Sequence, residues 1–316
     1  MKKAKKNPES REALTGNSKR GSDSAEALPK RVERYSKAKS RALTMVTYLR
    51  DQSTTRAHIV ASKQTECGAW LEFSHYTDVD QVRLTKASFC KQHLTCPLCA
   101  IRRGSKQVNS YLEKYEQLRE KSPMLRAYLV TFTVKNGEDL NERQNHLADS
   151  LRKLHGKRRD KARGGRSVTE ASKATAAVWS FELTNQGNGW HPHVHAIWLC
   201  EEAPVQEALS AEWHRITGDS FIVDIRRISD EEPASGFVEV FKYALKFSDL
   251  TPEQNWFAAE TFRGARLLGS FGSFRGIKPP ESLKDEALDD MPYTALFFKY
   301  LPDGYSLQRV TRHEPD

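Results

Sequence analysis

The sequence has 316 residues and a formal charge of +9, with 50 Lys and Arg against 41 Asp and Glu. Hydrophobic residues make up 38% of it, and no apolar run reaches the ~18 residues that a membrane-spanning helix requires. Five cysteines and an N-terminus without an apolar leader argue against a secreted, disulfide-bonded protein. Membrane, secreted and fibrous classes are therefore excluded, and a cytoplasmic location is expected.

Positive charge is concentrated at the N-terminus. Residues 1–50 contain 14 Lys and Arg against 5 Asp and Glu, which equals the net charge of the whole chain. Such a segment attracts polyanions non-specifically through counterion release, or it serves only as a solvated tail. We predict a basic, largely disordered arm at 1–50, in which a short helix begins near residue 32.

Strands and helices alternate after this arm, around an apparent hairpin. Apolar runs at 127–134, 176–183 and 190–199 are rich in β-branched and aromatic residues and are bounded by turn signals, which predicts strands. This order favours an α+β fold with an antiparallel sheet. The other expected elements are β-like runs between 58 and 100, helices at 102–120, 140–154, 202–217, 234–248 and 251–266, a strand at 221–228 and a glycine-rich turn at 269–276.

A basic, glycine-containing stretch at 155–166 follows the helix predicted at 140–154. It is either an exposed loop or a loop that contacts phosphates, and the histidine motif downstream favours the second interpretation. We therefore expect DNA contacts from Lys157, Arg158 and Arg159.

Four of the five cysteines lie between residues 67 and 99. Cys96 and Cys99 have the C-x-x-C spacing of a zinc knuckle, and Cys67 and Cys90 would complete a four-thiolate structural zinc site. His93 is an alternative ligand. A redox pair or unrelated buried thiols are the competing interpretation.

Three histidines alternate in the strand predicted at 190–199. Successive strand side chains point to opposite faces, so His191, His193 and His195 share one face and Val194 occupies the other. Glu182 on the preceding strand reaches the same face across the turn. Two histidines and a carboxylate can hold a divalent ion that acts as a Lewis acid on phosphate, either Mg²⁺ or Mn²⁺, and Zn²⁺ also fits these ligands.

A tyrosine with charged neighbours lies in the helix predicted at 234–248. Glu239 and Tyr243 are four residues apart and would share one helix face, with Lys242 and Lys246 close by. Positive charge favours the phenolate, so Tyr243 is a candidate nucleophile. The alternative is an amphipathic helix with a solvent-facing ion pair.

In combination these motifs resemble the rolling-circle plasmid replication initiators, which are members of the HUH endonuclease superfamily. The strand YLVTFTVKNG at 128–137 looks like the first family motif. GWHPHVHAIWL matches the metal-binding motif, with His193 and His195 as its core pair, and EVFKYALK places Glu239 and Tyr243 at the positions of the catalytic glutamate and tyrosine. The cysteine block FCKQHLTCPLCAIRR and the segment RLLGSFGSFRGI also resemble the family.

The resemblance implies an HUH-type nuclease domain with a central antiparallel sheet flanked by helices, preceded by a small cysteine-rich zinc segment. It implies transesterification on origin DNA by Tyr243, with a divalent cation on His193, His195 and either Glu182 or His191. Glu239 would activate water for the terminating cleavage, and Lys242 or Lys246 would neutralise phosphate or phenolate charge. Host helicase and polymerase are the expected partners.

We therefore expect a cysteine-rich segment at 51–105, a nuclease domain at 106–277 and a C-terminal tail at 278–316 without a functional prediction. Three alternatives remain at this point. One is a single-tyrosine HUH transposase or relaxase, and another is a zinc-stabilised DNA-binding regulator without cleavage activity. The third is a zinc hydrolase that uses the three histidines, although the sequence contains no H-E-x-x-H signature.

Overall fold

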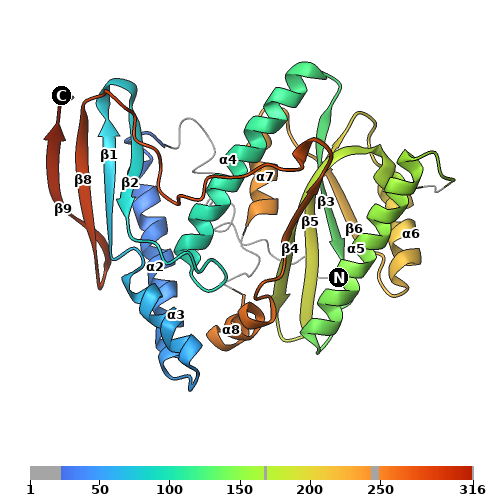
Figure 1. The fold of residues 1–316 in the computed structure, drawn as a ribbon, viewed down its shortest axis with the longest axis horizontal. Helices are drawn as coiled ribbons and strands as arrows, with labels where there is room; N and C mark the ends of the chain where they lie inside the picture. Colours follow the sequence, from blue (N-terminus) through green and yellow to red (C-terminus); the bar gives the residue numbers. More distant parts are fainter. Residues whose placement is uncertain (1–22, 167–168, 243–248, 315–316) are drawn as a thin grey trace. The chain divides into compact units, whose positions relative to one another are not determined.

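The computed structural model describes residues 23–166, 169–242 and 249–314, and the chain divides into two compact units. One unit is Val108–Lys278, and the other joins Met1–Gln107 to Pro279–Asp316. Helices and antiparallel strands occur in both (Figure 1), which confirms the predicted α+β fold class. Within the described residues, no helix is both long enough and apolar enough to cross a membrane.

A five-stranded antiparallel sheet organises the unit Val108–Lys278 (Figure 1). Its strand order is β6-β3-β5-β4-β7, so β5 lies at the centre. The four strands predicted between residues 127 and 228 are all present. The strands are β3 (Arg126–Thr133), β4 (Ala174–Asn185), β5 (Trp190–Cys200), β6 (Val223–Arg227) and β7 (Leu268–Phe271).

The two faces of β5 carry different side chains. Val194, Ala196 and Trp198 are buried in an apolar core with residues of α5 (Leu140–Ala162) and α6 (Gln206–Thr217). His193 and His195 alternate with them and therefore belong to the opposite face. The helix α7 (Pro233–Phe241) contacts β3, β4 and β5. Because its Val240 carbonyl accepts a hydrogen bond from Ser180, which pairs with His195 across the sheet, α7 covers the histidine face.

A tight turn fixes the β4–β5 hairpin. Gly187 and Gly189 have φ values of +87° and +80°, a backbone region that glycine adopts without steric cost. A Cβ on Gly189 would also lie 2.7 Å from the carbonyl oxygen of Gly137. The turn aligns Asn185 with Trp190, and this pairing sets the register of the whole hairpin.

The helix predicted at 140–154 is longer than expected. α5 continues to Ala162 and so includes most of the stretch predicted as a basic loop. Lys and Arg are good helix formers, and Gly156 costs only about 1 kcal/mol within a helix, so the basic composition did not mark an end. The helix stops instead before Gly164, whose φ is +83°.

The helix predicted at 234–248 is described only in its first part, since residues 243–248 lie outside the described residues. α7 ends at Phe241, and the Lys242 backbone has left the helical region with ψ at 167°. Phe237 and Phe241 are buried against Tyr115 and Tyr111, with ring centroids 5.6 and 4.9 Å apart. Phe241 is the last residue of α7 in this aromatic packing. The spacing of apolar residues in the sequence indicates a helix but does not show at which residue the helix ends.

Two further elements complete this unit. α8 (Pro252–Thr261) begins with a capping box formed by Thr251 and Gln254, and it is shorter than the helix predicted at 251–266. Of the glycine-rich segment predicted as a turn at 269–276, the first three residues belong to β7 and the next three form a short 3₁₀ helix, Gly272–Phe274. Gly269 is required there because a Cβ would lie 2.3 Å from the Trp179 ring.

The other unit contains a four-stranded antiparallel sheet and helices. The strand order is β2-β1-β8-β9, so strands from near the two ends of the sequence pair with each other. Its elements are α2 (Leu28–Arg50), α3 (Thr55–Glu66), β1 (Trp70–Tyr76), β2 (Gln81–Ala87), the first turns of α4 (Pro97–Lys121), β8 (Tyr293–Leu301) and β9 (Gly304–His313).

This arrangement corrects the predicted organisation of the chain ends. α2 occupies most of the second half of the arm predicted at 1–50, and the tail predicted at 278–316 supplies two strands. Pairing of β1 with β8 joins segments more than 200 residues apart, a long-range contact that no local pattern encodes. Residues 1–22 lie outside the described residues.

A buried ion cluster fastens the segment before β8 to this unit. The Asp285 carboxylate accepts hydrogen bonds from Arg31 at 2.7 Å, Arg102 at 2.6 Å and Lys106 at 3.0 Å. Burial would raise the pKa of Asp285, but Arg102 and Arg31 hold it well below its usual range. Arg102 is itself buried and also donates to the Leu283 carbonyl at 2.8 Å. The cluster makes residues 283–285 part of the folded unit.

Candidate metal centre and active site

A carboxylate and two imidazoles meet on the α7 side of the central hairpin. Glu182 on β4 pairs directly with His193 on β5, and His195 lies two residues later on the same face. Glu182 Oε2 lies 3.0 Å from His195 Nε2, and Glu182 Oε1 lies 3.5 Å from His193 Nε2. These ligand atoms all lie within 4.8 Å of one another, so one ion could contact all three.

Hydrogen bonds to the other ring nitrogens orient both imidazoles. His193 Nδ1 lies 3.3 Å from the His191 carbonyl oxygen, which can only accept, so Nδ1 is the donor in this contact and Nε2 is the ring nitrogen that faces Glu182. His195 Nδ1 lies 3.0 Å from the hydroxyl of Thr131 on β3. Such outer contacts hold metal-binding imidazoles in the correct orientation.

The surroundings favour the ligand forms of these groups. Burial would raise the pKa of Glu182, but the imidazoles of His193 and His195 hold it well below its usual range. Burial lowers the pKa of His195, and Glu182 only partly offsets this effect. An ionised carboxylate and a neutral imidazole are the forms that bind a metal ion.

His191 occupies a different position from the other two histidines. Among the described residues, the group that could hold a metal ion here consists of Glu182, His193 and His195. The His191 ring donates instead to Asn136 Oδ1 at 2.6 Å, and its backbone carbonyl orients His193. Because Asn136 holds its ring, His191 fits a role in fixing the β4–β5 hairpin better than the ligand role that the sequence also allowed.

The candidate catalytic glutamate borders the same centre. Glu239 on α7 pairs with Lys242, and both side chains are largely buried. Burial would raise the pKa of Glu239, but Lys242 and His195 lower it, so the carboxylate is ionised. Tyr243 and Lys246, predicted as the nucleophile and a catalytic lysine, lie outside the described residues.

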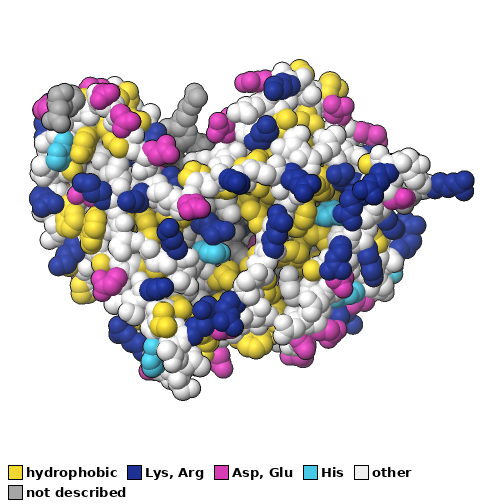
Figure 2. Space-filling model, in the orientation of Figure 1, with side chains coloured by type: hydrophobic (Ala, Val, Ile, Leu, Met, Phe, Trp, Pro, Cys, Tyr) yellow, Lys and Arg dark blue, Asp and Glu magenta, His cyan; other side chains and the backbone are white. Residues whose placement is uncertain are grey.

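Basic side chains gather along α5 (Figure 2), where the DNA-contacting residues were predicted. The Arg158 guanidinium lies 3.6 Å from the centroid of the Phe271 ring, and Lys157 Nζ lies 3.7 Å from Glu212 Oε1. Arg159 is exposed. These three residues therefore lie on a helix with different surroundings rather than together on a loop.

The four predicted cysteines come together in the other unit. Cys67 Sγ lies 3.7 Å from Cys96 Sγ and 3.5 Å from Cys99 Sγ, while Cys90 Sγ lies 3.6 Å from Cys99 Sγ. Cys67 caps α3, and Cys99 lies in the first turn of α4. Four sulfur ligands at these separations suit tetrahedral Zn²⁺. Among the described residues, His93 is not a member of this group.

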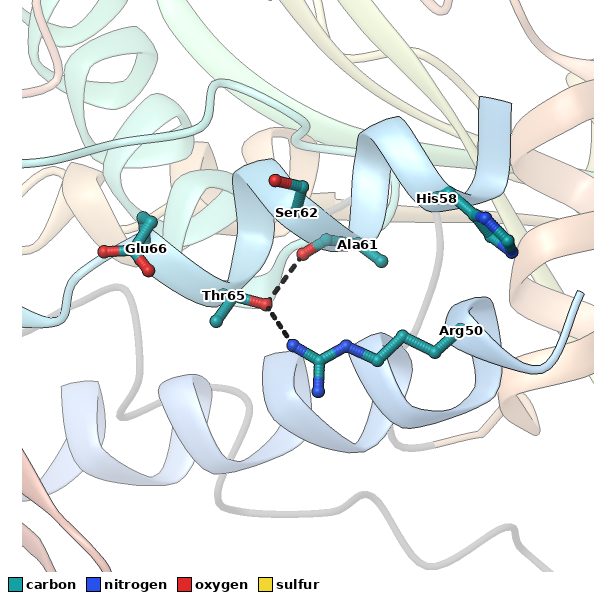
Figure 3. A pocket seen from close by; sticks show the side chains of 6 residues that line it. All are labelled: Arg50, His58, Ala61, Ser62, Thr65 and Glu66. Carbon is teal, nitrogen blue, oxygen red and sulfur yellow. Dashed lines mark hydrogen bonds between the residues drawn. The ribbon is translucent and has the colours of Figure 1, made fainter. Parts of the chain in front are cut away.

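A polar pocket lies near these cysteines in the sequence, along α3 (Figure 3). Thr65 accepts a hydrogen bond from Arg50 at 3.2 Å and donates one to the Ala61 carbonyl at 2.9 Å. The other side chains that line the pocket are those of His58, Ser62 and Glu66. These contacts join α2 to α3, which accounts for the pocket as part of the helix packing.

An antiparallel sheet with a His-hydrophobe-His motif on its central strand, a carboxylate facing that motif and a helix that carries Glu239 over the same face agree with the HUH class of domain that the sequence motifs resemble. The model of a family described as replication protein matches residues 81–295, well over half of the chain. The chain therefore belongs to this family of replication proteins and is a plasmid rolling-circle replication initiator. Searches of curated proteins and of solved structures each found no match.

The cysteine cluster gives a direct prediction. Replacing Cys99 by serine is expected to remove bound zinc and to lower the thermal midpoint of unfolding by roughly 10 °C or more, because structural zinc supplies several kcal/mol of folding free energy. Zinc content by atomic emission and a calorimetric scan of the full chain measure this. Cys200→Ser is the matched control, since Cys200 is a buried thiol on β5 and should leave the zinc content unchanged. Retention of zinc by Cys99→Ser would contradict the assignment.

Proposed function

We propose that this replication initiator is an origin-nicking endonuclease and strand transferase, with the nuclease chemistry in the unit Val108–Lys278. The supporting observation is the group of Glu182, His193 and His195 beside an ionised Glu239. Two nitrogen ligands and a buried carboxylate fit a divalent cation, Mg²⁺ or Mn²⁺. When bound, such a cation acts as a Lewis acid on the scissile phosphate.

The first step is a transesterification by Tyr243. Its phenolate oxygen attacks phosphorus, the bond from phosphorus to the 3′-oxygen breaks, and that oxygen takes up a proton to become a free 3′-hydroxyl. The 5′-phosphate stays attached to the tyrosine, so the energy of the phosphodiester bond is kept for strand closure. The 3′-hydroxyl would prime synthesis by a host polymerase, with a host helicase opening the duplex. Lys246 or Lys242 would offset the negative charge of the phenolate or phosphate.

Termination needs a second cleavage, and Glu239 is the candidate base for it. Its carboxylate is ionised and close enough to the metal ligands to interact with His195. We propose that it takes a proton from the attacking water, which is the role of a general base. Lys242 forms an ion pair with this carboxylate and so helps to hold it in place.

Cleavage of single-stranded DNA tests the proposal. Labelled oligonucleotides tiled over the plasmid origin are incubated with the full chain and Mn²⁺ or Mg²⁺, then resolved on a denaturing gel. We expect a metal-dependent nick at one position, a free 3′-hydroxyl on one product and a protein-linked 5′ end on the other. Tight binding of duplex without any cleavage would support the non-catalytic regulator instead.

Replacing Glu239 by glutamine is expected to separate the two cleavages. The first nick and its covalent product should form normally, because Tyr243 supplies that nucleophile. The hydrolytic cleavage should slow by about 10²- to 10⁴-fold, the usual contribution of a general base. Single-turnover release of DNA from the adduct measures this. Glu231→Gln, an exposed position before α7, is the control, and equal slowing of both cleavages would argue against a role specific to termination.

A further inference from the structure

The sheet β2-β1-β8-β9 has two chemically different faces. Phe73 on β1 and Phe298 on β8 pack edge to face, and Phe73 lies under the Arg31 guanidinium of α2. The α2 side is therefore the inner face. Trp70, Glu72, Phe297 and Lys299 alternate with these residues and belong to the outer face.

Aromatic rings form a partly exposed row on this outer face. The Trp70 and Phe297 rings are stacked, with centroids 5.7 Å apart and an interplanar angle of 29°. At the other end of the strands, Tyr293 stacks on His313 with centroids 4.7 Å apart. Trp70, Phe297 and Tyr293 are only partly buried, and His313 is exposed. Rings packed between strands in this way are held rigidly while remaining accessible.

Cations lie directly beside these rings. Lys299 pairs with Trp70 across the strands, and Arg309 pairs with Phe297, with its guanidinium 5.2 Å from the ring centroid. Lys299 and Arg309 are both exposed. Glu72 is the carboxylate among them, and it is paired with Lys86 at 2.8 Å. Figure 2 shows hydrophobic and basic side chains next to each other over β8 and β9.

We propose that the outer face of this sheet, formed by Trp70, Phe297, Lys299 and Arg309, binds single-stranded DNA. Stacked aromatic rings with interleaved cations are the combination that holds unpaired bases and their phosphates without reading sequence. A duplex keeps its bases stacked inside and offers no ring faces to Trp70 or Phe297. This inference depends on the proposed function only because it takes origin DNA as the ligand. It gives the unit that contains the cysteine cluster a role in holding the opened strand.

The strand β9 provides a matched pair of arginines for the test. Arg309 pairs with Phe297 and faces outward, whereas Arg312 pairs with Thr294 and lies on the opposite face beside Glu314. We expect Arg309→Ala to weaken binding of a (dT)₂₀ oligonucleotide about tenfold and to reduce the salt slope by about 0.7, the value for one phosphate contact on a single strand. Arg312→Ala should leave both nearly unchanged. Fluorescence anisotropy of the full chain carrying Tyr243→Phe separates binding from cleavage.

A second measurement detects stacking directly. Irradiation of a 5-iodouridine oligonucleotide bound to the full chain is expected to crosslink peptides that contain Trp70 or Phe297, and peptide mapping identifies them. Phe297→Leu should lose the crosslink on the peptide that contains residue 297 and should bind duplex as before. If Arg309→Ala and Arg312→Ala reduced the affinity for the oligonucleotide equally, the proposal would be overturned in favour of non-specific attraction. Crosslinks found only on peptides without Trp70 or Phe297 would overturn it as well. A change in oligomeric mass with unchanged DNA binding would instead assign this face to pairing between two copies. Absence of nicking with intact crosslinking would overturn only the nuclease.

Discussion

Replacing Tyr243 by phenylalanine is expected to abolish nicking and covalent attachment to DNA, by at least about 10³-fold. The substitution removes one oxygen atom, which in the proposed reaction is the atom that attacks phosphorus. The proposed metal ligands Glu182, His193 and His195 are unchanged. Binding of single-stranded DNA should therefore persist, because binding does not require the phenolate.

The measurement is a denaturing gel of labelled origin oligonucleotide in Mn²⁺, with mass spectrometry of the wild-type adduct. The adduct is expected on the peptide that contains Tyr243. Tyr128→Phe is the matched control, since Tyr128 is a buried tyrosine of β3 in the same unit and lies on the core side of the sheet. Full nicking by Tyr243→Phe, or an adduct on another peptide, would rule out this nucleophile.

Replacing Glu182 by glutamine is expected to weaken Mn²⁺ binding by at least about 10- to 100-fold, the loss seen even when an outer partner of a metal site is removed. The side chain keeps its size but loses the charge that both imidazoles face at 3.0 and 3.5 Å. The amide oxygen of glutamine carries no net negative charge, so it binds a divalent cation more weakly than the carboxylate oxygen of glutamate does. Nicking should fall in parallel.

Isothermal titration with Mn²⁺ and the nicking assay measure the two effects separately. Glu138→Gln, an exposed carboxylate of the same unit, should leave both unchanged. Zinc content should also stay constant, because the four cysteines lie in the other unit. Undiminished Mn²⁺ affinity in Glu182→Gln would show that the hairpin carboxylate is not a ligand, whatever the effect on nicking.

Much of the candidate metal centre was predictable because its geometry is local. Strand alternation places His193 and His195 on one face, and a short turn then sets Glu182 opposite His193. Thr131 was missed, although it pairs with His195 in the register of β3 and β5. A threonine in an apolar strand that faces a candidate metal ligand is a usable signal, but it can be recognised only once the partner strand is known.

The sequence by itself determined the α+β class, the central strands, the face shared by the histidines and the set of four cysteines. The tertiary structure alone decided that α5 extends through the basic stretch, that α7 ends at Phe241, and that β8 and β9 join β1 and β2. It also brought Asp285 to Arg31 and Arg102. The division has a physical reason: periodicity and turn geometry act between residues close in the chain, whereas strand pairing and buried ion clusters depend on contacts between segments hundreds of residues apart.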